Sequence, residues 1–149
     1  MMKMTILENI HNLKKLKMDN LYIGKESKIS KVFSAQDVES FASLSCDINP
    51  VHLDEEYAKQ TFFRKRIVHG FLYGSLISAI IGSKMPGHGS IYMHQEMNFK
   101  RPVYINEKVT AKVIITEIKP EKSLVFLDTF CYNDKNEIVI EGKAIIKRI

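Results

Sequence analysis

The stretch FLYGSLISAIIGS, residues 71–83, carries no charged side chain and is apolar on almost every side of a helix. A helix that is hydrophobic all round is normally buried inside a larger structure. Small residues along it, such as Gly74 and Gly82, would let a sheet pack closely against the helix. The stretch therefore predicts one central buried helix around which the rest of the chain folds.

After the turn cluster MPGHG (85–89), the pattern changes to the two-residue period of β-strands. Apolar and polar residues alternate, and short polar turns separate the segments. An antiparallel meander wrapped around one central helix is the economical arrangement, which makes the predicted fold class α+β. The predicted strands of this meander cover residues 90–100, 108–118, 123–132 and 137–147.

The segment before the central helix predicts one strand and two short helices. A strand is expected over residues 28–33. Ser34, followed three residues later by Asp37, forms the capping-box pattern that opens a helix. That helix must end before Pro50, because the residue before a proline avoids the α conformation. A second helix fits residues 54–60, with acidic residues at its positive end.

The first 20 residues form an extension to a single domain that we expect over residues 21–149. Apolar residues recur in the extension at helical spacing, which predicts a short amphipathic helix that packs on the domain or on a partner chain. The extension has no apolar core or cleavage site of a secretory signal. The helical spacing comes from Ile6, Ile10, Leu13 and Leu16.

The composition excludes several classes of protein. The 149 residues suit one domain, and the 45% hydrophobic and 26% charged fractions are ordinary for a globular protein. No apolar run reaches the ~18 residues of a membrane span. The net charge is +5, but only four of the 22 basic residues are Arg and they are scattered, which argues against nucleic-acid binding.

Two cysteines, Cys46 and Cys131, are too few for a disulfide framework, and no CxxC motif is present. We therefore expect buried free thiols in a reducing compartment, which favours the cytoplasm. Cys46 directly precedes Asp47, and a neighbouring carboxylate disfavours the thiolate that a catalytic cysteine needs.

The sequence CDINPVH, residues 46–52, places an acid and a histidine five residues apart, with Pro50 between them. The proline interrupts any regular element, so a loop is expected to position the side chains of Asp47 and His52. His52 suits a general base at neutral pH, and Asp47 could hold the same water or relay a second proton. Asp47 and His52 are therefore the candidate catalytic pair, and either could take the first proton.

Metal binding is an alternative use of these residues. Asp47, His52 and His69 could form a set of two histidines and one carboxylate. However, the chain has no HExxH motif. An EF-hand also fails, because position 6 counted from Asp47 is His52 rather than glycine, and position 12 is Ala58 rather than glutamate. We expect no metal.

Three ordered blocks resemble the MaoC-like (R)-specific enoyl-CoA hydratases, which have the hot-dog fold. The family's D-x-N-P-x-H motif is intact as Asp47, Asn49, Pro50 and His52, and its H-G pair is intact at residues 69–70. The resemblance covers about residues 20–149. The blocks are FASLSCDINPVHLDEEYA (41–58), RIVHGFLYGSLIS (66–78) and MNFKRPVYINEKVTA (97–111).

The resemblance implies hydration of a trans-2-enoyl thioester to the (R)-3-hydroxyacyl thioester, or the reverse dehydration. Gly70 joins the catalytic residues, because its backbone N–H at the start of a buried helix could stabilise the thioester oxygen. Asn49 is expected to shape the loop or donate to the site, and His69 to fix the turn before Gly70. Ser78 lies at a position that the family uses to line its acyl pocket. We count Asn49, His69 and Ser78 as substrate-binding candidates.

Other functions on the same fold remain open. Hot-dog thioesterases and acyl-carrier-protein dehydratases commonly take a carboxylate from the central helix, and residues 70–84 contain none, which argues against both classes. A 3-hydroxyacyl-carrier-protein dehydratase and a non-catalytic acyl-thioester binding protein remain alternatives.

The resemblance also implies partners. It implies a homodimer or higher homo-oligomer, and we expect no cofactor beyond the coenzyme A or carrier protein that is part of the substrate. The lack of a long apolar run predicts no membrane partner. Basic side chains are expected at the phosphates of coenzyme A, and a solvated surface is the equal alternative for each candidate. The candidates are Arg64, Lys65, Arg66, Lys100 and Arg101.

Overall fold

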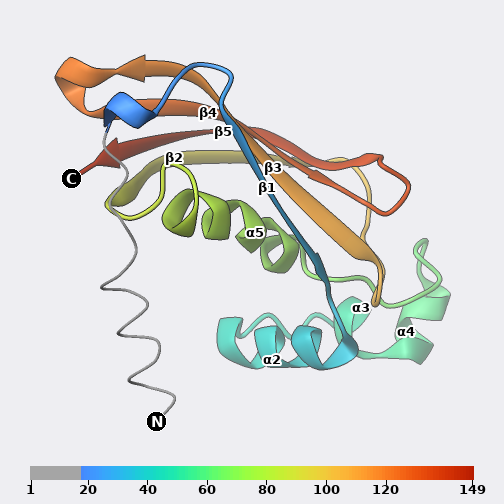
Figure 1. Cartoon of the computed structure of the whole chain (residues 1–149). Coiled ribbons are helices and arrows are strands. Elements are labelled where there is room, and N and C mark those ends of the chain that lie inside the picture. The colour runs from blue at the N-terminus through green and yellow to red at the C-terminus, as the bar shows by residue number, and fades with distance from the viewer. Residues whose placement is uncertain (1–17) are drawn as a thin grey trace, which may run out of the picture.

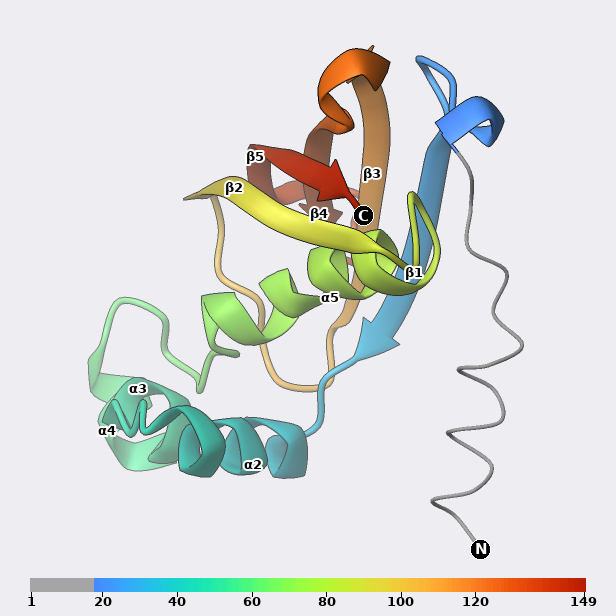
Figure 2. The same cartoon turned by 90° about the vertical axis from the view of Figure 1, so that its left-hand side faces the viewer.

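A five-stranded antiparallel sheet curves around one helix, α5 (Gly70–Ser83), as Figures 1 and 2 show. The computed structural model describes residues 18–149. The predicted α+β hot-dog class is confirmed, whereas the predicted amphipathic helix of the extension lies outside the described residues. The strands are β1 (Glu26–Val32), β2 (Ser90–Phe99), β3 (Lys108–Lys119), β4 (Leu124–Tyr132) and β5 (Ile138–Arg148).

The order of strands across the sheet is β1-β3-β4-β5-β2, so the predicted four-strand meander is only partly right. Strands β3, β4 and β5 do follow one another. Strand β2, however, pairs with β5 at the far edge rather than with β3. Alternation looks the same in any strand order, and for this reason the sequence pattern could not show the crossover. Both β1 and β2 are left as edge strands.

Three short helices form a separate layer beyond α5, away from the sheet (Figure 1). Both bonds of the predicted capping box are present, since Asp37 N–H donates to Ser34 Oγ and Ser34 N–H donates to Asp37 Oδ2. No helix among residues 18–149 is long and apolar enough to cross a membrane. The helices are α2 (Ala35–Ser45), α3 (Pro50–Leu53) and α4 (Glu55–Gln60), with 3-10 turns at Met18–Asn20 and Pro120–Lys122.

The core lies between α5 and the concave face of the sheet. Alternate residues of β3 point inward and are fully buried, as the two-residue period predicts. The buried residues of α5 include Leu76, Ile77, Ile80 and Ile81, which pack in the same cluster as the inward side chains of the strands. This shared apolar surface is what holds α5 inside the sheet.

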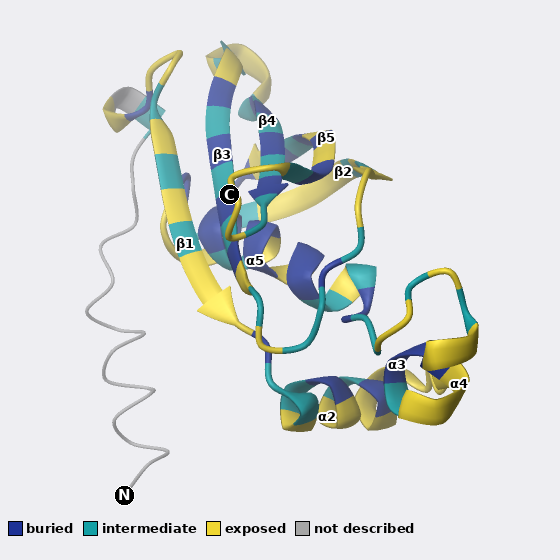
Figure 3. Ribbon diagram, turned by 90° about the vertical axis from the view of Figure 1, so that its right-hand side faces the viewer, coloured by how far each residue is buried: buried dark blue, intermediate teal, exposed yellow. Residues whose placement is uncertain are grey.

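One face of α5 is not covered by the chain, so the predicted all-round burial is wrong there. Phe71 is 69% exposed, and Ser75, Ser78 and Gly82 are also exposed. In Figure 3, the ribbon of α5 is coloured in part as buried and in part as exposed. Of the two glycines named above, Gly74 allows close packing of the sheet, because a methyl group there would lie 3.0 Å from Met97 Sδ, whereas a methyl group at Gly82 would meet no atom within 4 Å. The sheet wraps only part of the helix and leaves this face open.

Gly142 on β5 offers a test of how tightly the sheet closes. A methyl group at Gly142 would overlap the carbonyl oxygen of Glu96 on β2. We expect Gly142→Ala to lower the free energy of unfolding by about 1–3 kcal/mol, because backbone must move. Gly82→Ala is the matched control; it meets no atom within 4 Å and should raise stability by about 0.5–1 kcal/mol. Urea unfolding of both variants measures this, and equal stabilities would contradict it.

Candidate active site

The loop after α2 positions the carboxylate of Asp47. Cys46 ends the helix in the left-handed conformation with φ 65° and is exposed, contrary to the expected burial of both cysteines. Asn49 N–H then donates to Asp47 Oδ1 at 3.2 Å. Asn49 Oδ1 in turn accepts from Val51 N–H at 3.4 Å and so caps α3. Asn49 therefore shapes the loop, the first of its two predicted roles.

His52 lies on a helix rather than on a loop, which corrects the expectation for residues 46–52. Pro50 is the first residue of α3, a position where its missing N–H costs no helical hydrogen bond. The proline thus ends the loop that holds Asp47 and starts the short helix that holds His52. Asp47 therefore lies on a loop and His52 on a helix, and Pro50 separates the two.

The imidazole of His52 is held in one tautomer. Its Nδ1 lies 2.8 Å from the carbonyl oxygen of Ile67, which can only accept a hydrogen bond. Nδ1 therefore carries the proton, and Nε2 has a free lone pair. Burial lowers the pKa of His52 below the usual 6.5, with a smaller contribution in the same direction from His69. His52 is neutral at pH 7 and can accept a proton.

His69 lies beneath His52 and ties it to the Asp47 loop. The two rings stack with centroids 3.8 Å apart, and Phe41 packs edge-on against His69 at 4.9 Å. His69 Nε2 donates to the carbonyl oxygen of Asp47 at 3.0 Å. The side chain is 1% exposed, so its contacts are with the protein itself. This geometry fits the predicted role of fixing the turn before Gly70.

The structure brings the predicted acid and histidines together. One potential ligand atom from each of Asp47, His52 and His69 lies within 4.8 Å of the others. The stack disfavours a shared metal, because zinc lies about 2.0–2.1 Å from each nitrogen and near the plane of each ring. An ion between rings stacked 3.8 Å apart would lie well outside at least one ring plane.

Gly70 opens α5 beside His52. The first N–H groups of a helix have no partner within the helix, and they point toward whatever lies at its N-terminus. Glycine leaves room for the Phe99 ring, because a methyl group here would lie 2.5 Å from Cε1 of Phe99 and the ring would have to move. A groove of about 540 Å³ contains both residues, and we call it the first groove. It is lined by His52, Phe62, Phe63, Ile67, Val68, Gly70, Phe71, Tyr73, Phe99, Lys100, Arg101 and Pro102.

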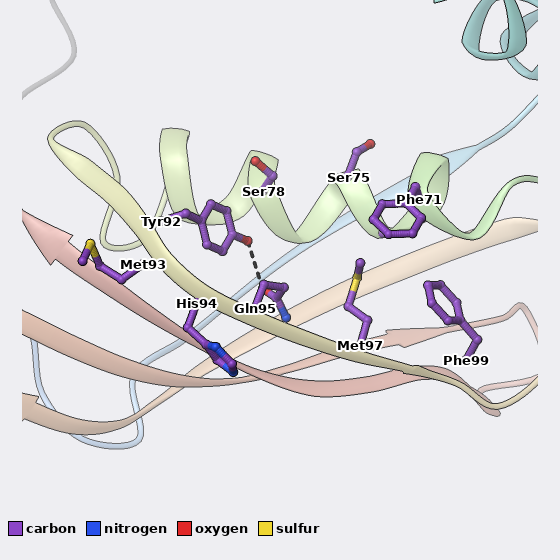
Figure 4. Close-up of a pocket in the computed structure, with 10 residues that line it drawn as sticks. Phe71, Ser75, Ser78, Tyr92, Met93, His94, Gln95, Met97 and Phe99 are labelled. Atoms are coloured by element: carbon purple, nitrogen blue, oxygen red, sulfur yellow. Dashed lines mark hydrogen bonds between the residues drawn. The ribbon is translucent and has the colours of Figure 1, made fainter. Parts of the chain in front are cut away.

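Ser78 does not lie in the first groove with His52 and Gly70. It lies on the exposed face of α5 in a second groove of about 550 Å³, between the helix and β2 (Figure 4). The second groove is lined by Phe71, Gly74, Ser75, Ser78, Tyr92, Met93, His94, Gln95, Met97 and Phe99.

Two of the five basic candidates line the first groove. Lys100 and Arg101 lie there, each beside a glutamate at 3.7 and 4.0 Å respectively. Arg66 instead makes a hydrogen bond within the protein, because its Nε donates to the carbonyl oxygen of His52 at 2.7 Å. Arg64 and Lys65 do not line the groove, and Arg64 donates to the carbonyl oxygen of Lys59.

Sequence reasoning missed two contributors to the site. The carbonyl group of Ile67 sets the tautomer of His52, and a backbone acceptor leaves no signal in the residue type. Phe99 lies over Gly70 from the end of β2. Its place beside residue 70 depends on how the sheet wraps α5, which local periodicity does not describe.

Comparison with known proteins identifies the family. The model of the MaoC-like domain matches residues 19–129. An (R)-specific enoyl-CoA hydratase from Aeromonas caviae is 40% identical over 86% of this chain and 96% of its own, and one from Rhodospirillum rubrum is 43% identical over 83% and 85%. The unliganded R-hydratase of Pseudomonas aeruginosa superposes with a TM-score of 0.85 at 36% identity, covering 90% of this chain and 86% of that one. The chain belongs to the MaoC-like domain family.

Proposed function

We propose that the chain is an (R)-specific enoyl-CoA hydratase that adds water to trans-2-enoyl-CoA, or removes it in reverse. One observation carries this proposal: a carboxylate oxygen of Asp47 and a ring nitrogen of His52 lie within 4.8 Å of each other, and His52 lines the first groove together with Gly70 at the N-terminus of α5. A base, a second polar group and a helix N-terminus are the groups that hydration of a conjugated thioester requires. The hydratase relatives support the same reading.

The proposed reaction begins with a water molecule held between Asp47 and His52. His52 Nε2 takes one proton as the oxygen bonds to the β carbon of the enoyl group. The electrons of the carbon–carbon double bond move onto the thioester oxygen. The imidazolium then gives its proton to the α carbon, so one water is consumed and His52 returns to its neutral form.

Gly70 provides the stabilisation of the developing negative charge. Its N–H lies at the positive end of α5, and its missing side chain lets the thioester approach the backbone. One such donor is typically worth about 10²–10³-fold in rate. Asn49 acts in this scheme by holding the Asp47 loop, and His69 by supporting both catalytic residues from below.

We propose coenzyme A as the thioester carrier, with no separate cofactor or metal. Lys100 and Arg101 lie in the first groove, where phosphates would compete with Glu141 and Glu137 for them. Such half-exposed ion pairs are worth about 0–1 kcal/mol, so a phosphate can displace them. The free thiols of Cys46 and Cys131 fit a cytoplasmic location, and burial raises the pKa of Cys131 to about 12.

The proposal includes a homodimer that covers the open face of α5 and the edge of β2. An edge strand offers unpaired backbone groups to a second copy. Exposed apolar side chains gather there, and a second copy would bury them and place Ser78 at the interface. These side chains are Phe71, Ile91, Tyr92, Met93 and Phe99.

The catalytic pair is tested with crotonyl-CoA. We expect Asp47→Asn and His52→Ala to lower kcat by about 10²–10⁴-fold, because each removes a group that handles the reacting water. Asp134→Asn, in the β4–β5 turn, is the matched control and should retain the wild-type rate. Loss of enoyl-thioester absorbance measures the rate, and chiral analysis should show the (R) product. Activity only on carrier-protein thioesters would favour the dehydratase alternative, and inactivity on both would leave a binding protein.

The pH dependence should follow the protonation of His52. The neutral imidazole is the active form, and burial lowers its pKa below 6.5. The value of kcat/KM should therefore stay level from pH 8 to 6.5 and fall only at lower pH, as His52 gains a proton. A pH profile of kcat/KM measures this for the free enzyme. A midpoint at or above 6.5 would contradict the role or the environment assigned to His52.

The dimer is tested on the edge of β2. Met93, which is 59% exposed, lies where the β2–β5 register shifts, and Met93→Lys would put a charge into the proposed interface. Light scattering should give twice the 17.2 kDa chain mass for the wild type and the single-chain mass for the variant. Val32→Lys on β1, the opposite edge, is the matched control and should remain a dimer. A monomeric wild type would overturn this part of the proposal.

A further inference from the structure

The short helix α3 carries His52 but is too short to fix its own position. It has four residues, Pro50–Leu53, and the first turn of a helix is costly to form alone. The last carbonyl groups of a helix also have no partner within the helix. Other parts of the chain must therefore hold α3 in place, and with it the imidazole of His52.

Residues 66 and 67 supply partners for the end of α3. Ile67 N–H donates to the carbonyl oxygen of Val51 at 3.3 Å. Arg66 Nε donates to the carbonyl oxygen of His52 at 2.7 Å, a distance typical of a hydrogen bond from a charged donor. A positive side chain is also favoured at the C-terminal end of a helix, because the helix dipole is negative there. The carbonyl groups of Val51 and His52 are therefore both bonded to one short segment.

The segment 66–68 is itself fixed on its other side, by the loop between β2 and β3. Val68 N–H donates to the carbonyl oxygen of Val103 at 2.7 Å, and Ile67 forms an antiparallel bridge with Tyr104. Both valines belong to the hydrophobic core. Residues 66–68 thus join the core to α3, so they can hold the helix at a defined position.

The bond that selects the tautomer of His52 depends on where its backbone lies. The ring Nδ1 lies 2.8 Å from the carbonyl oxygen of Ile67. Hydrogen bonds weaken steeply when they are misaligned, so a small shift of the His52 backbone would weaken this one. The other tautomer carries its proton on Nε2, where a base needs a lone pair. Arg66 limits such a shift, because it bonds the main chain of the same residue.

The surroundings of Arg66 favour this role over ligand binding. Its side chain is 14% exposed and does not line the first groove. Its Nη2 is buried and makes no hydrogen bond within residues 18–149. The carboxylate of Glu39 on α2 lies 3.7 Å from Nη2, but the Glu39 side chain is 61% exposed, so solvent weakens this ion pair. The bond from Nε to His52 is therefore the stronger of the two contacts.

We propose that Arg66 is a positioning residue for the general base: its hydrogen bond to the main-chain carbonyl of His52 keeps the imidazole in the tautomer with a free Nε2. The inference rests on the proposed function, since it treats His52 as the base. Arg66 touches neither the reacting water nor the thioester, and it acts only through His52. Its loss should slow the chemical step and leave substrate binding unchanged.

The test compares full-length Arg66→Gln and Arg66→Lys with the wild type, using crotonyl-CoA. Arg66→Gln should lower kcat by about 10–100-fold, because a misplacement of about 1 Å at a reacting group can cost 10²-fold. KM should stay within about two-fold, because no interaction with the bound substrate is removed. Arg66→Lys keeps the charge but not the planar guanidinium, so it should recover only part of kcat.

The nitrogen-15 chemical shifts of the His52 ring give a readout that a purely structural role would not move. They are assigned by their loss in His52→Ala. The wild type should show a protonated Nδ1 and a bare Nε2, whereas Arg66→Gln should show a mixture of both tautomers. These shifts need no turnover. A wild type that does not hydrate crotonyl-CoA would count against the proposed function, and the shifts would still test Arg66.

Glu39→Gln is the matched control, because it removes the carboxylate beside Arg66 and leaves the bond to His52. Its kcat and its His52 shifts should match those of the wild type. An unchanged kcat in Arg66→Gln would overturn the inference, as would a raised KM with an unchanged kcat. A lower kcat with the wild-type tautomer would also overturn it. So would an equal loss in Glu39→Gln, or unfolding of both Arg66 variants.

Discussion

The stack of His52 on His69 is the contact on which the site depends. His69 immediately precedes α5, and its carbonyl group accepts from Leu72 and Tyr73 at 3.0 and 3.3 Å. Its ring supports His52 and its Nε2 holds the carbonyl group of Asp47. One buried residue therefore links the helical layer that carries the acid and the base to the central helix that carries Gly70. Any movement of α5 would move all of these groups together.

This arrangement places a polar site at the border of an apolar core. The sheet must curve around α5 to bury its aliphatic side chains, and that curvature brings Phe99 over the start of the helix. A side chain at position 70 would force the ring to move. The same packing that stabilises the fold thus keeps the helix N-terminus free of side chains, where backbone N–H groups can face a ligand. The contact between Phe99 and Gly70 therefore belongs both to the packing of the fold and to the candidate site.

The chain leaves one side of its central helix uncovered. Ser78 and the second groove lie on that side, whereas the acid and base lie in or beside the first groove. A second copy would close the open face without contributing to the His52–Asp47 geometry, which is complete within one chain. The candidate catalytic residues therefore come from one chain, whereas the open face of α5 and the edge of β2 form the surface where the proposed second copy would bind.

The sequence by itself determined most of the helices and strands and identified the residues of the candidate site. The uncharged stretch at 71–83 predicted the central helix, Ser34 with Asp37 predicted the start of α2, and Asp47 and His52 were identified as a pair. These are local properties, because caps, periodicity and motif residues act over a few positions. Such signals also misled: Pro50 was taken only as a break, although it opens the helix that carries His52.

Only the tertiary structure decided which groups meet. The place of β2 beyond β5, the carbonyl group of Ile67 at His52, and the contact of Phe99 with Gly70 all join residues far apart in the chain. Alternating strands look alike in every order, and backbone acceptors are the same in every residue. The open face of α5 could not be predicted either. An apolar sequence shows that a helix can be buried, but it does not show how much of the helix its own sheet will cover.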